Sequence, residues 1–148
     1  MTDQRRRILI VDDYVDSLES WKLFFTMSGF EVLTAVDGEA AVQLVIGQRP
    51  DVVVLDLALP ILTGVEAARQ IRALPGMHRL PLIATTGYSG GNPVQAAQEA
   101  GFDRILIKPC DPGLLLAEVE RLLAARHSTE GLPAAAPTTP PTSVTPSS

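Results

Sequence analysis

The sequence is poor in cysteine and lacks any long apolar run. Cys110 is the only cysteine, so an intrachain disulfide is impossible and a reducing, cytoplasmic location is favoured. The apolar stretch nearest the N-terminus, residues 8–11, is too short for a signal-peptide core or a membrane span. These absences predict a soluble protein with no membrane partner.

Clustered basic residues are also scarce. The formal net charge is -5, and the one basic cluster is the run of three arginines at 5–7. Binding to nucleic acid phosphates needs clustered Lys and Arg, so the charge argues against nucleic acid as a direct partner. We expect the arginine cluster to be a solvated N-terminal flank. The two histidines, His78 and His127, lack the spacing of metal ligands, and Cys110 is expected to be packed rather than reactive.

Short runs rich in β-branched residues alternate with longer segments of helical periodicity. A run such as "VVVL" is apolar on both faces, which is typical of a strand covered by helices on both sides of a parallel sheet. The intervening segments place apolar side chains on one face at helical spacing. The predicted strands are 8–11, 31–35, 51–55, 81–84 and 104–107, and the predicted helices are 16–28, 38–47, 65–73, 93–100 and 112–126.

This alternation predicts a doubly wound α/β domain. Five β-α units imply a parallel sheet with helices on both faces, and the flavodoxin-like strand order 2-1-3-4-5 is the leading candidate. A dinucleotide-binding half is disfavoured because no Gly-x-Gly-x-x-Gly follows the first strand. We assign residues 1–127 to this domain. Residues 128–148 are rich in Pro, Thr, Ser and Ala, and we predict that they form a disordered tail.

Polar side chains follow the predicted strands where their carboxyl ends meet. Asp12 and Asp13 follow the first strand, Asp56 the third, Thr86 the fourth and Lys108 the fifth. Three crowded carboxylates need a compensating cation, which Lys108 supplies in part and a hard divalent ion such as Mg²⁺ supplies for the rest. A carboxylate nucleophile, a divalent ion, a lysine and a hydroxyl donor together predict phosphoryl transfer, with Asp56 attacking in line.

Four motifs in order resemble the receiver domain of two-component response regulators, a CheY-like domain. They are "VDDYVD", "DVVVLDLALPILTG", "PLIATTGYS" and "GFDRILIKPC", and the resemblance runs from about residue 7 to residue 126. The middle motif places Pro60 and Gly64 at the fourth and eighth positions after Asp56. The resemblance implies a signalling protein that takes a phosphoryl group from a sensor histidine kinase or a histidine phosphotransfer protein.

The resemblance also implies a role for each matching residue. Asp56 would be the phosphoacceptor, and Asp13 and Asp56 would hold Mg²⁺ together with the backbone carbonyl of Ala58. Asp12 would contribute through a metal-bound water. Lys108, in a cis bond to Pro109, would pair with the phosphoryl group, and Thr86 would hydrogen-bond to it.

Two positions depart from the family pattern. Ile105 stands three places before Lys108, where the family often has Tyr or Phe, so the usual coupling between Thr and an aromatic ring is in doubt. Ala58 and Tyr88 stand two places beyond Asp56 and Thr86, at positions that affect phosphate lifetime in the family. We expect Tyr88 to obstruct the hydrolytic water.

Several functions stay open at this point. The chain is expected to be no conventional enzyme, although it would catalyse its own phosphorylation and dephosphorylation, and it would signal by contact with an unknown downstream protein. A phosphorelay intermediate and a phosphate-independent binding module are the alternatives, the second favoured only by Ile105. An aspartyl phosphatase is rejected, because Ala58 stands where such an enzyme needs a second acid.

Overall fold

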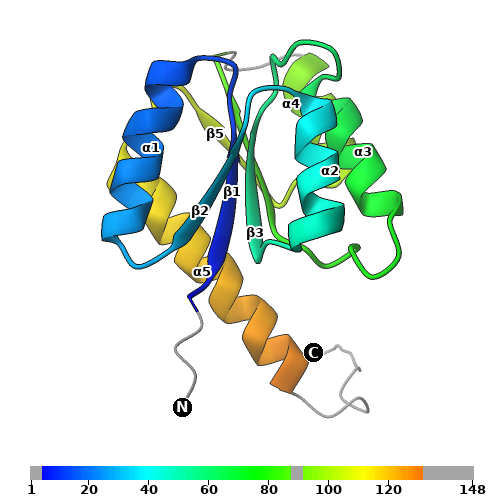
Figure 1. Cartoon of the computed structure of the whole chain (residues 1–148). Coiled ribbons are helices and arrows are strands. Elements are labelled where there is room, and N and C mark those ends of the chain that lie inside the picture. Colours follow the sequence, from blue (N-terminus) through cyan, green and yellow to red (C-terminus); the bar gives the residue numbers. More distant parts are fainter. Residues whose placement is uncertain (1–4, 88–91, 132–148) are drawn as a thin grey trace, which may run out of the picture.

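Strands and helices alternate throughout the computed structural model, which describes residues 5–87 and 92–131 (Figure 1). The five predicted strands and five predicted helices are all present there, with bounds within two residues of the prediction except at the end of the last helix. In chain order the elements are β1 (Arg7–Val11), α1 (Val15–Met27), β2 (Glu31–Ala35), α2 (Gly38–Gln48), β3 (Val52–Asp56), α3 (Gly64–Ala73), β4 (Leu82–Thr86), α4 (Asn92–Ala100), β5 (Arg104–Ile107) and α5 (Pro112–Gly131).

The strands form one parallel sheet in the order β2-β1-β3-β4-β5, as predicted. β1 and β3 are neighbours, with Val11 opposite Leu55, and β3 and β4 are neighbours, with Asp56 opposite Thr85. The chain order reverses between β1 and β3, because β2 lies on one side of β1 and β3 on the other. In open parallel sheets of this kind, ligands bind outside the carboxyl ends of the strands at such a reversal.

Helices cover both faces of the sheet (Figure 1). On one face, α1 and α5 pack Phe25, Leu115 and Val119 against alternate residues of the central strands, such as Ile10 and Val54. On the other face, α2, α3 and α4 enclose a second apolar cluster. Every residue of β3 is buried, which explains why its sequence shows no polar alternation.

Local sequence signals fix where several helices begin. The Thr63 side chain accepts from the Glu66 N–H while the Glu66 carboxylate accepts from the Thr63 N–H, forming a capping box before α3. Asp111 caps α5 by accepting from the Leu114 N–H at 3.1 Å. Such caps satisfy amide groups that the first helical turn leaves without partners.

The C-terminal helix is longer than the periodicity predicted. It runs to Gly131, five residues past the predicted end and into the segment assigned to the tail. The rest of the predicted tail, residues 132–148, lies outside the described residues, as does Tyr88. Among the described helices, none has the length and apolar character needed to cross a membrane.

Two residues of the arginine cluster are more than a flank: the side chains of Arg6 and Arg7 stay partly solvated, 40% exposed each, but they also hold contacts to the domain. Arg6 donates two hydrogen bonds to the Glu120 carboxylate, at 2.7 and 3.0 Å, and its guanidinium lies over the Phe30 ring. Arg7 is part of β1, and its guanidinium donates to Glu31 and to the carbonyl of Gln48. These contacts hold the start of β1 to α5 and β2. A planar guanidinium group can make them because it donates several hydrogen bonds at once.

Candidate functional site

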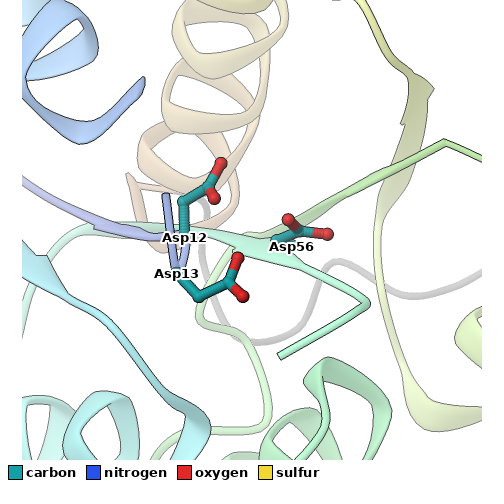
Figure 2. Close-up of side chains that lie close together, drawn as sticks. All are labelled: Asp12, Asp13 and Asp56. Carbon is teal, nitrogen blue, oxygen red and sulfur yellow. The ribbon is translucent and has the colours of Figure 1, made fainter. Parts of the chain in front are cut away.

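Three carboxylates meet at the carboxyl end of the sheet (Figure 2). Asp12 and Asp13 directly follow β1, and Asp56 is the last residue of β3. One carboxylate oxygen from each lies within 4.8 Å of the others. Because β1 and β3 are neighbours at the reversal of chain order, the fold brings together side chains that are more than forty positions apart in the sequence.

The acidic pair shares one pocket because β1 has already ended. Adjacent residues of a strand point to opposite faces, but regular strand geometry stops at Val11. Asp12 is 4% exposed, whereas Asp13 is exposed. The Asp12 carboxylate accepts from the Tyr14 N–H at 3.0 Å. This local turn aims one carboxylate inward and leaves the other open to solvent.

Lys108 reaches the carboxylates from the end of β5. Its ammonium nitrogen lies 2.7 Å from Asp56 Oδ2 and 3.3 Å from Asp12 Oδ2. The Lys108 N–H donates to the Thr86 carbonyl, and the Lys108–Pro109 peptide bond is cis, as the resemblance implied. The charge of Lys108 offsets one of the three carboxylates and no more.

The environment of Lys108 shifts its pKa upward. Partial burial lowers the pKa, but the hydrogen bond to Asp56 and the negative charges of Asp56 and Asp12 outweigh that loss of solvation. The net effect is a pKa raised above the usual value of 10.5. Lys108 therefore carries its full charge at neutral pH.

Main-chain groups complete the surroundings of Asp56. Asp56 Oδ1 accepts from the Ala58 N–H at 3.1 Å, and the Leu57 N–H donates to the Thr85 carbonyl. Asp56 is 5% exposed. The N–H groups of Tyr14 and Ala58 each lie two residues after the aspartate that accepts from them, as in Asx turns. These two turns were not predicted from the sequence.

The other candidate residues, which include Thr86 and Cys110, differ in how far they are buried. Thr86 is the last residue of β4 and is buried, 2% exposed, while Thr85 is opposite Asp56 in the register. Cys110 is half-buried and donates weakly to the Ile107 carbonyl, in keeping with the packed role expected of it. Burial raises the pKa of its thiol despite the nearby charge of Lys108. His78 is exposed, and the side chain of His127 lies outside the described residues.

The geometry fits a divalent ion held by oxygen atoms. All three converging ligands are carboxylates, two are buried, and Lys108 is the one cation that the described residues place against them. Mg²⁺ prefers oxygen ligands and commonly takes one or two carboxylates together with waters. A cluster with surplus negative charge and an exposed member, Asp13, can admit such an ion from solvent.

Comparisons with known proteins point in the same direction. A family model for the response regulator receiver domain matches residues 8–120. The chain is 40% identical over 123 residues to the transcriptional regulatory protein PrrA of Mycobacterium bovis, which covers 83% of this chain and 52% of PrrA. It is 34% identical to the DNA-binding response regulator MtrA of the same species, over 83% of this chain and 53% of MtrA. The chain thus spans about half the length of these relatives.

Solved structures show the same architecture. A CheY-like response regulator receiver domain protein from Methanospirillum hungatei has a TM-score of 0.80 at 26% identity, covering 85% of this chain and 99% of that one. The receiver domain of the sensor histidine kinase PA1611 from Pseudomonas aeruginosa has a TM-score of 0.77 at 29% identity, covering 82% and 99%. That structure holds a magnesium ion in its active site cleft.

One expectation finds no support in these comparisons. The low basic charge argued against nucleic acid as a direct partner, yet one relative is named a DNA-binding response regulator and another a transcriptional regulatory protein. The net charge is that of this chain, which matches only about half of each relative. It is therefore a poor guide to the partners of proteins that carry this half within a longer chain.

Proposed function

The chain belongs to the receiver-domain family of two-component response regulators, and we propose that it is a phosphorylation-dependent switch whose phosphoacceptor is Asp56. The observation that carries this proposal is the contact of Asp56 with Lys108, at 2.7 Å, inside a cluster of three carboxylates. A buried carboxylate held by a lysine and an amide is preorganised to take on an anionic group.

The donor is a phosphohistidine of a sensor histidine kinase or of a histidine phosphotransfer protein. An oxygen of Asp56 attacks the phosphorus, so that an O–P bond forms as the P–N bond breaks. The electron pair of the P–N bond goes to the imidazole nitrogen of the donor, which takes up a proton. No other covalent change is required of this chain, so its residues serve to orient the carboxylate and to offset charge.

Mg²⁺ is the cofactor of this proposal. Asp13 and Asp56 would hold it with the carbonyl of Ala58, and Asp12 would contribute through a water. When bound, the ion supplies positive charge that stabilises the oxygens of the transferring group. Support comes from the oxygen-only ligand set in this chain and from the magnesium-containing relative described above.

Lys108 and Thr86 act on the phosphoryl group after transfer. In the structure, the Lys108 ammonium donates a hydrogen bond to Asp56 Oδ2. It would move to a phosphoryl oxygen, because the phosphoryl oxygens carry negative charge whereas the carboxyl group of the acyl phosphate is neutral. Thr86, at the end of the neighbouring strand β4, would donate its hydroxyl to a second phosphoryl oxygen. The shift of these two side chains is the event that a downstream protein would detect.

A phosphorelay role is the second candidate. It is favoured by the likeness to the receiver domain of a sensor histidine kinase. In that role, the phosphoryl group would pass from Asp56 to a histidine of another protein.

Ile105, half-buried against the core where the family often has an aromatic ring, favours instead a module that signals without phosphate. A cytoplasmic location and a protein as downstream target are part of the main proposal.

The experiment is the intact mass of the full chain after incubation with Mg²⁺ and acetyl phosphate. One phosphoryl group should add to the unaltered chain and to Asp16→Asn, a matched carboxylate change in the first turn of α1. No group should add to Asp56→Asn or to the chain kept free of metal. An adduct on Asp56→Asn would contradict the assignment. No adduct, together with an amide spectrum that beryllofluoride leaves unchanged, would favour the phosphate-independent module.

A further inference from the structure

A cavity of about 400 Å³ lies beside the carboxylates, on the face of the sheet that α1 and α5 cover. Its floor is formed by Ile10 and Val54 of the central strands, which are only 2% and 3% exposed. The cavity therefore reaches down between the helices to the sheet itself. Its volume falls within the range of about 300–1,000 Å³ that small-molecule sites occupy.

The walls of the cavity are apolar and aromatic. Trp21 of α1 supplies a half-buried indole on one side, and Pro109 and Cys110 of the β5–α5 connection supply the other. An indole wall favours a flat ring or a short aliphatic body, because aromatic side chains stack on such groups. A cavity of this volume favours a small molecule as its occupant.

The inner end of the cavity is charged. Asp12 and Lys108 both line it, and Lys108 is shared between Asp12 and Asp56. Asp13 and Asp56 do not line the cavity, but they belong to the same cluster as Asp12, so three carboxylates stand against one ammonium beside it. In the metal-free chain, this surplus negative charge attracts a second cation to this end and repels an anion.

We propose that this cavity binds a small amphipathic amine, with its apolar body against Trp21 and its ammonium group toward Asp12. Ligand sites typically combine an apolar lining with a few convergent polar groups, which is the arrangement here. Only the charged end discriminates between ligands, so an amine binds and a carboxylate of the same shape does not.

The amine and Mg²⁺ compete, because both use the charge of Asp12. Reciprocity requires that each weakens the other by the same factor, and couplings of this kind are commonly about fivefold or more. An amine in the cavity would therefore slow the loading of Asp56. This regulatory consequence rests on the proposed function, whereas binding of the amine does not.

The test uses 2-phenylethylamine as probe and 3-phenylpropionate as its anionic counterpart, both added to the full chain. Binding is followed by amide chemical shifts and by the fluorescence of Trp21, the only tryptophan. We expect saturable changes with the amine, an affinity at least tenfold lower for the carboxylate, and an apparent Mg²⁺ dissociation constant raised about fivefold by the amine.

Two matched variants of α1 locate the site. Ser17 lines the cavity, whereas Ser20 is exposed and does not. Ser17→Leu should fill the cavity and abolish amine binding while Mg²⁺ still binds. Ser20→Leu should bind the amine like the unaltered chain.

Each contrary result overturns the proposal. These results are no saturable change with the amine, equal binding of amine and carboxylate, or amine binding that survives Ser17→Leu. If only a helical peptide from a histidine-bearing partner shifted the cavity residues, the cavity would be a protein-docking groove instead. Phosphorylation by acetyl phosphate, measured on the same samples without amine, separates a failure of this inference from a failure of the proposed function.

Discussion

At the scale of single residues, Lys108 carries the clearest electrostatic signature. Its pKa is raised in the folded chain above the usual 10.5, chiefly because the Asp56 hydrogen bond and charge overcome the effect of burial. A group with a raised folded pKa contributes stability that is fully present below its unfolded pKa and is lost as the pH rises through the folded value. The contribution of Lys108 therefore persists at neutral pH and disappears only above about pH 10.5.

The first prediction concerns the titration of Lys108 in the metal-free protein. We expect the pKa of Lys108 to fall in Asp56→Asn, because the substitution removes the charge of its nearest partner, 2.7 Å away. Side-chain NMR of the lysines measures this directly, since the chain has only two. Lys22, exposed on α1, is the internal control. An unchanged Lys108 titration in the variant would show that Asp56 does not hold the ammonium in solution.

Individual site residues were predictable where the topology places strand ends together. Asp12, Asp13, Asp56 and Lys108 each lie at or just after the end of a strand, so order and alternation were enough to bring them to one edge. The main-chain donors were not foreseen, because an amide has no signature of its own in a sequence. The structure confirms that these four side chains converge, whereas the role of each of them, like those of Thr86 and the carbonyl of Ala58, stays a prediction.

At the scale of elements, Gly64 shows why the β3–α3 connection needs a glycine. A Cβ added there would lie 2.8 Å from Leu57 Cα and press against the Asp56 carbonyl oxygen. α3 therefore begins with its backbone packed directly on the main chain of Asp56 and Leu57. The resemblance placed a glycine at this position, and the packing supplies its physical reason.

The second prediction compares two glycine substitutions. Gly64→Ala should destabilise the fold by about 2 kcal/mol, as overpacking typically does, and should also slow phosphorylation because Asp56 must shift. Gly47→Ala, within α2, adds a Cβ that meets nothing within 4 Å. It should stabilise the fold by up to about 1 kcal/mol, since alanine is the better helix former. Urea unfolding measures both effects, and equal stability of the two variants would contradict the packing argument.

Element bounds were predictable within two residues because strand and helix periodicities differ. Contacts between distant segments were not predictable, because they lie outside any local window. Arg72 of α3 is an example, since its guanidinium donates to the carbonyls of Met77, Leu80 and Gly101 and pairs with Asp103. It ties two loops at the amino end of β4 and β5, yet the sequence shows only one basic residue on a helix. The ties of Arg6 to α5 escaped prediction for the same reason.

At the scale of the whole molecule, the sheet gathers negative charge at the carboxyl ends of its strands, and the positive charge of Lys108 offsets only part of it. The strand order and both layers of helices were predictable, because five β-α units and the family motifs permit few arrangements. The cavity between α1 and the β5–α5 connection was not, because it depends on how far that helix and that connection stand apart. Stability and function conflict at this edge, since the carboxylates that attract an ion repel one another without it.

The third prediction follows from that conflict. Mg²⁺ should stabilise the folded chain against heat, by about 2.7 kcal/mol at a concentration one hundred times its dissociation constant, because the unfolded chain lacks the converged carboxylates. When metal is absent, Asp13→Asn should be more stable than the unaltered chain. Addition of Mg²⁺ should barely change its stability. The exposed position of Asp13 lets asparagine replace it without disturbing the core.

Thermal unfolding in Mg²⁺ and in sodium chloride of equal ionic strength distinguishes a bound ion from general screening. Screening acts on every exposed charge, so it would stabilise the unaltered chain and Asp13→Asn alike. A bound ion needs the converged oxygens, so it would stabilise only the chain that keeps all three carboxylates. If the two salts raised the unfolding temperature equally, the surplus charge at the sheet edge would be a passive feature of the surface, and the magnesium assignment would fail with it.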